Sequence, residues 1–105
     1  MANLFVRSSD GNNSDNGTTW ALAKATLVGA TGIDAAGDTI FLSHTHSEST
    51  ASSVSPAIAG TLAAPTKIIC GNDGAEPPTA LSTAAVVAAT GSNSITITGI
   101  SYYVY

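Results

Sequence analysis

Strand-like runs recur along this sequence at a nearly constant spacing, and this recurrence constrains the fold more than any other feature. The three strongest runs are centred on Ile40, Ile68 and Ile97, which lie 28 and 29 residues apart. A smaller run lies ten residues before each of the last two, at Ile58 and Val87. Repeats of about 20–50 residues are typical of solenoids. The spacing therefore predicts a mainly β protein, a short parallel β-helix-like solenoid, with a small β-sandwich as the alternative.

The N-terminal part of the chain differs from the rest and predicts one helix. Residues 3–7 form a strand-like run, and a turn-rich stretch of Asn, Asp, Ser and Gly follows. Thr18 or Thr19 is suited to cap the N-terminus of a helix. The next apolar residues are spaced by three and four, as on one face of a helix: Trp20, Ala23, Leu27 and Ala30.

One domain accounts for the whole length. We expect a single β-rich unit over residues 1–105, because 105 residues suffice for only one modest core. Residues 1–37 should form a strand, a turn and a capping helix, and residues 38–105 should form β coils that can continue beyond the chain.

The last residues form an apolar, aromatic strand without a polar tail. Such a strand at a sheet edge invites pairing with another chain. We therefore expect that either the natural protein continues past Tyr105 or a partner covers this edge. The side chains that we expect at an inter-subunit contact lie in the final two strand-like runs: Ile95, Ile97, Ile100, Tyr102, Tyr103 and Tyr105.

The scarcity of charge argues against several classes of function. Charged residues make up 10 % of the chain, against roughly 25 % in ordinary soluble domains. Three cations, Arg7, Lys24 and Lys67, are too few to neutralise a run of phosphates, so we expect no nucleic-acid partner and no membrane partner. No apolar stretch approaches the roughly 20 residues of a membrane span. The first residues lack the pattern of a signal peptide, so we expect synthesis in a host cytoplasm.

One local motif has the residue types of a metal site. Residues two apart on an extended strand share a face, so His44, His46 and Glu48 would point the same way. Two imidazoles and a carboxylate suit a transition metal. A pH-sensitive interface contact is an alternative. The interpretation that the sequence favours most is a solvated turn, because a Ser- and Thr-rich loop follows.

The other candidate chemistry points away from catalysis. Most of the seven acidic residues lie beside Gly or Asn, where turn geometry explains them. No nucleophile elbow and no phosphate-binding glycine loop appears. Cys70 is the single cysteine and lies in an apolar run, so we expect it to be a small buried hydrophobic residue. We therefore expect no enzyme activity and no cofactor.

A set of short motifs in the first part of the chain resembles a known family. The motifs are Phe5-Val6-Arg7, Asp10-Gly11, Asp15-Asn16-Gly17-Thr18-Thr19-Trp20-Ala21, Ala25-Thr26-Leu27 and Ala36-Gly37-Asp38-Thr39-Ile40-Phe41. They are similar to the segment that leads, through a capping helix, into the first coil of right-handed parallel β-helix proteins of the pectate-lyase-like type. In particular they resemble those found among bacteriophage tail-spike and particle-surface proteins. The resemblance covers residues 3–43, and the rest of the chain is similar only in style.

The resemblance implies trimeric or particle-bound assembly and, in some members of the family, polysaccharide cleavage. This chain is too short for the long groove and paired carboxylates of those enzymes, so only the fold and the setting carry over. Some phage spike proteins hold iron with an H-x-H pair from each of three chains, and His44 and His46 are similar to that pair.

These observations lead to three hypotheses. The favoured one is a structural bacteriophage virion protein, a head-surface (decoration) or tail-associated module that acts through assembly. It would be a homo-oligomer, with a trimer favoured, and would contact other virion proteins. The first alternative is the N-terminal anchor of a receptor-binding or polysaccharide-degrading tail spike. The second is a bacterial surface adhesin or a carbohydrate-binding module.

Overall fold

The protein consists mainly of short strands, as the sequence predicts. The computed structural model describes residues 2–99 and 102–104, the last three by their backbone alone. Along the described chain the elements are β1 (Asn3–Val6), α1 (Leu27–Thr31), β2 (Thr39–Ser43), β3 (Ser47–Thr50), β4 (Ala57–Ile58), β5 (Thr66–Gly71), β6 (Val86–Ala89), β7 (Thr98–Gly99) and β8 (Tyr102–Val104). Among the described residues, no helix reaches the length and hydropathy of a membrane-spanning segment.

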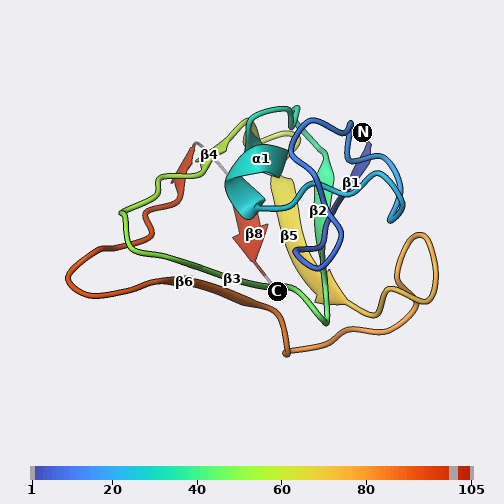
Figure 1. Cartoon of the computed structure of the whole chain (residues 1–105). Coiled ribbons are helices and arrows are strands. Elements are labelled where there is room, and N and C mark those ends of the chain that lie inside the picture. The colour runs from blue at the N-terminus through green and yellow to red at the C-terminus, as the bar shows by residue number, and fades with distance from the viewer. Residues whose placement is uncertain (1, 100–101, 105) are drawn as a thin grey trace.

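The described strands form three sheets in which every strand pair is parallel. The largest sheet has the order β1-β2-β5-β8, and the two smaller sheets pair β3 with β6 and β4 with β7. Parallel neighbours need a crossover connection. The chain runs through β2, β3 and β4 and then returns to place β5 beside β2. It next lays β6 beside β3 and β7 beside β4 before β8 joins β5 (Figure 1).

The register confirms half of the predicted repeat. Ile40 pairs with Ile68, the two residues that the 28-residue spacing aligned. Ile68, however, pairs on its other side with Val104, so the predicted match with Ile97 is wrong. The reason is a long loop after β5, which folds back so that Gly71 bridges Leu81 in antiparallel fashion. This loop lengthens the path from β5 to β8, so the later strands no longer follow the spacing of the predicted repeat.

The smaller runs also form strands, but they are not equivalent. Ile58 lies in β4 and pairs with Gly99 of β7. Val87 lies in β6 and pairs with Glu48 of β3. The two runs that the sequence aligned therefore belong to different sheets. The predicted strand around Ile97 is reduced to a bridge and the two residues of β7.

The predicted helix is wrong in its first half. Helix α1 begins at Leu27, and its N-cap is Thr26, whose side chain accepts a hydrogen bond of 3.0 Å from the Gly29 N–H. The residues before it pair with β1 instead. The Lys24 N–H donates to the Phe5 carbonyl, and the Lys24 carbonyl accepts from the Arg7 N–H directly after β1. Both hydrogen bonds are 2.9 Å long. These backbone partners replace the ones that a longer helix would have supplied.

The four apolar residues of the predicted helix are nevertheless buried, two in each of two cores: Leu27 and Ala30 in one, Trp20 and Ala23 in the other. Successive residues of a strand point to opposite faces of the sheet. One face of β1, β2 and β5 packs with α1 in the main core, whose buried members are Leu4, Val6, Leu27, Ala30, Ile40, Leu42, Ile58, Ile68 and Cys70. On the other face, an aromatic core holds Phe5, Trp20, Ala23 and Phe41. Cys70 is buried in the main core, which confirms the expectation that it serves as a small buried hydrophobic residue.

Residues 8–34, which we call the N-terminal segment, lie along the outer edges of β1, β3 and β4. On β1, the Phe5 N–H donates to the Gly17 carbonyl at 2.8 Å. On β3, the Ser47 N–H donates to the Ser8 hydroxyl at 2.9 Å. After β4, the Ala59 N–H donates to the Asp34 carboxylate at 3.0 Å. At this end of the three sheets, which we call the first end, one backbone donor on β1, one on β3 and one directly after β4 thus have partners from the N-terminal segment.

Candidate functional site

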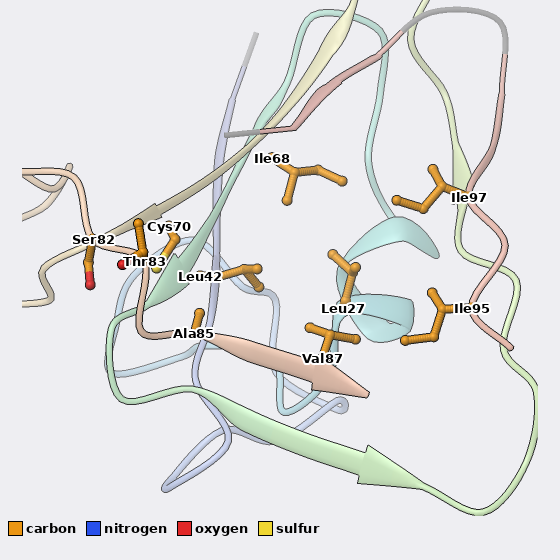
Figure 2. A pocket seen from close by; sticks show the side chains of 10 residues that line it. All are labelled: Leu27, Leu42, Ile68, Cys70, Ser82, Thr83, Ala85, Val87, Ile95 and Ile97. Carbon is orange, nitrogen blue, oxygen red and sulfur yellow. The ribbon is translucent and has the colours of Figure 1, made fainter. Parts of the chain in front are cut away.

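An apolar cavity of about 380 Å³ lies inside the circuit of strands. It falls within the size range of small-molecule sites, about 300–1,000 Å³. Figure 2 shows side chains from α1, β2, β5, β6 and the segment before β7 converging on one space. The lining residues are Leu27, Leu42, Ile68, Cys70, Ser82, Thr83, Ala85, Val87, Ile95 and Ile97.

The cavity brings together part of the predicted interface. Ile95 and Ile97 are half-buried and point into it from the segment before β7 (Figure 2). Of the other predicted interface residues, Tyr102 and Tyr103 lie in β8, which the structure describes by its backbone alone. The remaining two, at positions 100 and 105, lie outside the described residues, so their predicted place at a contact is untested.

The chemistry of the cavity suits apolar contact. Its polar side chains are the hydroxyls of Ser82 and Thr83 and the thiol of Cys70. Every Asp, Glu, Lys, Arg and His residue of the chain lies at or before Glu76, so the part of the sequence that supplies most of the lining carries no charge. The cavity can hold aliphatic groups, but its lining offers no acid–base pair.

The predicted metal set is not assembled, because His44 lies apart from the other two side chains and faces a different carboxylate. The imidazole of His46 is buried, and its Nε2 lies 2.8 Å from Oε1 of Glu48. The half-exposed ring of His44 instead faces Asp73, with 3.6 Å between Nδ1 and Oδ1. In the part of the chain that the structure describes, no group of three or more His, Cys, Asp or Glu residues is placed to hold a metal ion.

A tight turn explains why the alternation fails. The His46 N–H donates to the Ser43 carbonyl at 2.9 Å, which ends β2 and reverses the local direction. Residues share a face at a spacing of two only where the backbone is extended. Here β3 starts one residue after His46, so His44 belongs to the turn and Glu48 to the strand.

Glu48 connects the buried histidine to the helix. Its Oε1 also accepts a hydrogen bond of 2.8 Å from the Leu27 N–H, in the first turn of α1. The Nδ1 atom of His46 is buried and has no hydrogen-bond partner among the described residues. The pair therefore fixes the corner between β2 and β3 against α1, beside the cavity.

We expect Glu48→Ala to lower the free energy of unfolding by about 2–3 kcal/mol, because it leaves two buried donors without their acceptor. Glu48→Gln keeps an oxygen at this position and should cost about half as much. Ser49→Ala, at an exposed position of the same strand, should change little. Urea denaturation measures all three. Equal losses of unfolding free energy for the alanine and glutamine variants would contradict the role of Glu48 Oε1 as the acceptor of both hydrogen bonds.

A second polar cluster links the first strand to the loop after β5. Arg7 donates from Nε to Asp10 at 2.7 Å and from Nη1 to Asp73 at 3.2 Å. Its guanidinium also lies over the ring of Trp20, 5.4 Å from the centroid. The hydroxyl of the buried Ser43 donates to Asp73 at 2.7 Å. The cluster crosslinks three segments that are distant in sequence.

These contacts stabilise the ionised carboxylates. The hydrogen bond from Ser43, and after it the one from Arg7, holds the pKa of Asp73 below its ordinary value. For Asp10, the hydrogen bond from Arg7 lowers the pKa. Although Ser43, His44 and Asp73 are neighbours, the serine bonds to the carboxylate and not to the imidazole, so these three residues lack the nucleophile–base contact of a Ser-His-Asp triad.

The protein should lose stability in acid as Asp73 protonates. Because its folded-state pKa lies below the unfolded value of about 3.9, its contribution is full above that value and disappears as the pH falls through the folded pKa. We expect Asp73→Asn to cost about 2 kcal/mol at pH 7 and to flatten the fall in melting temperature below pH 5. Asp15→Asn, which removes the same charge from a turn, is the control. Parallel pH profiles for Asp73→Asn and the parent would contradict this assignment.

Sequence reasoning missed three acids that crosslink distant segments. The carboxylate of Glu76 accepts the Trp20 N–H at 2.7 Å. Asp34 accepts from the Thr66 hydroxyl at 3.1 Å, and the buried Asp38 accepts from the Ala2 N–H at 2.7 Å. The partners lie 32 to 56 positions away, so no local spacing could have revealed them.

Comparison with protein-family models, with curated proteins and with solved structures found no match to this chain.

Proposed function

We propose that the chain is a short right-handed parallel β-helix that serves as a structural module of a virion and acts through assembly. Three observations support the fold. Among the described residues all five strand pairs are parallel, β5, β6 and β7 lie beside β2, β3 and β4, and Ile40 pairs with Ile68. A sandwich is built from antiparallel sheets, so the pairing favours the coil. Parallel crossovers are almost always right-handed.

The observation that carries the assembly proposal is the contrast between the two ends of the coil. Backbone donors at the first end are bonded to the N-terminal segment. By contrast, the described chain after Glu76, which we call the last circuit, carries no charged residue and supplies most of the lining of the apolar cavity. Apolar surface and strand edges are the features that another polypeptide can cover. We therefore assign assembly to the last circuit.

The virion setting rests on the family resemblance of residues 3–43 together with the low charge of the chain. A decoration or tail-associated protein that forms a homo-oligomer, with a trimer favoured, fits both. The anchor of a tail spike is the second candidate, and the cavity favours it, since a further coil of a longer protein would fill this space with its inward side chains.

The test of assembly is the mass of the native particle. We expect light scattering and native mass spectrometry to give a discrete multiple of the 10.4 kDa chain. Deletion of residues 100–105 should reduce that mass to one chain, because it removes strand β8 from the edge of the large sheet. A parent protein that stays monomeric at every concentration, or a deletion that still assembles, would overturn the proposal.

A further inference from the structure

Backbone pairing fixes two opposite walls of the apolar cavity. On one side, Leu42 of β2 pairs with Cys70 of β5. Ile68 lies two residues before Cys70, so both side chains project from the same face of the sheet. The other wall is the segment before β7, where the Thr96 N–H donates to the Val54 carbonyl at 2.9 Å and thereby holds the isoleucines on either side of Thr96. Because these walls are already ordered, binding does not carry the entropic cost of ordering them.

The lining is polar at one end and aliphatic at the other. Figure 2 shows Ser82 and Thr83 beside Cys70 at one side of the space, and Ile95 and Ile97 at the opposite side. Thr83 is exposed, so the cavity reaches solvent at its polar end. A hydroxyl group can donate a hydrogen bond and accept one. None of the ten described lining residues is charged.

We propose that this cavity binds a small uncharged amphiphile, an aliphatic chain that carries one hydroxyl or carbonyl oxygen. The chain would lie among the leucines and isoleucines, and the oxygen would bond to the hydroxyl of Ser82 or Thr83. A charged ligand is disfavoured, because no described lining side chain could pair with its charge. The ligand would lie inside a single chain, so this binding function goes beyond the proposed assembly and does not rest on it.

The volume sets the size of the ligand. An engineered apolar cavity of about 150 Å³ binds benzene, which has six carbon atoms. A cavity of about 380 Å³ therefore suits a ligand of roughly ten to fifteen non-hydrogen atoms. Such a ligand is short enough for a limit in chain length to be measured directly.

The first experiment titrates the full chain with straight-chain primary alcohols from butanol to dodecanol and follows the isoleucine methyl groups by NMR. Signals of Ile68, Ile95 and Ile97 should shift, whereas that of the exposed Ile33, outside the lining, should not. Each added methylene should lower the dissociation constant about fourfold, the factor that corresponds to about 0.8 kcal/mol per buried CH₂. The gain should stop at about ten carbons, when the cavity is full.

Two matched variants locate the site. Ala85→Leu places a larger side chain in the cavity lining, and Ala84→Leu makes the same change at the exposed neighbouring position. Ala85→Leu should raise the dissociation constant of decanol at least about tenfold, because its side chain takes the place of ligand carbons. Ala84→Leu should change it less than about twofold. Thermal unfolding without ligand verifies that both variants fold, and the titration of the parent does not depend on them.

Three results would overturn the proposal. Shifts of Ile33 as large as those of the cavity isoleucines, or an affinity that rises without a limit in chain length, would show partition onto exposed apolar surface. No shift of the cavity isoleucines with any alcohol would show that the space is closed to small molecules, as when polypeptide fills it. Equal affinities for Ala85→Leu and Ala84→Leu would place the ligand elsewhere. None of these results alters the particle mass that tests assembly, so the two proposals can fail separately.

Discussion

Replacement of Trp20 by alanine should lower the free energy of unfolding by about 4 kcal/mol. The side chain is 5 % exposed, and its ring packs edge-on against Phe5 with 4.7 Å between the centroids. The indole N–H donates to the Ala75 carbonyl at 2.9 Å. One residue thus joins the aromatic core on the first strand to the loop after β5, and its truncation removes both contacts. Urea denaturation followed by circular dichroism measures the loss.

Two further variants separate packing from hydrogen bonding at this site. Trp20→Phe keeps an aromatic ring but loses the N–H donor, so we expect a loss of about 2 kcal/mol. Leu22→Ala truncates a neighbouring side chain that is 40 % exposed and should cost less than about 1 kcal/mol. If Trp20→Ala cost no more than Leu22→Ala, the aromatic core would not be the support that its burial indicates.

Gly11→Ala is expected to destabilise the protein by about 3 kcal/mol through overpacking. A β-carbon at this position would lie 2.2 Å from the Arg7 carbonyl oxygen and 2.5 Å from that of Lys24. Both are backbone acceptors: the Arg7 carbonyl accepts from the Gly11 N–H, and the Lys24 carbonyl accepts from the Arg7 N–H directly after β1. The segment must therefore move away from the strand edge to admit one methyl group.

Gly74→Ala is the matched control, because a β-carbon there meets no atom within 4 Å. We expect it to change the free energy of unfolding by less than about 0.5 kcal/mol. Thermal unfolding of the two variants beside the parent tests the pair. Equal melting temperatures for all three proteins would show that the close approach at Gly11 is not required.

The strands whose pairing sequence reasoning predicted correctly are those whose side chains are mostly buried. Runs of β-branched and aromatic residues identified β1, β2 and β5, and the 28-residue spacing gave the register of β2 on β5. Strand β3 was missed, because its residues Ser47–Thr50 are polar and largely exposed, so pairing with β6 and not burial places them. The helix was overextended because a buried stripe at helical spacing can be shared between two cores.

Sequence reasoning did not predict the cavity. It placed Ile95 and Ile97 at an inter-subunit contact, which stays a prediction. Both side chains line the cavity of their own chain, as residues two apart on an extended backbone share a face. Alternation failed for His44 and His46, because a turn separates them. The role of Glu48 as acceptor for the Leu27 N–H depends on tertiary folding, and no pattern within the sequence encodes it.

The confinement of charge to the first 76 residues divides the molecule into two thermodynamic regimes. Salt and acid act on the first end, where the ion pairs of Arg7 lie, since ionic screening and proton binding need charged groups. The last circuit, after Glu76, responds instead to temperature, because burial of apolar surface weakens on cooling. An assembly built on that circuit would be loosened by cold and almost indifferent to ionic strength, so a particle that carries it could pass between dilute and saline media without losing the contact.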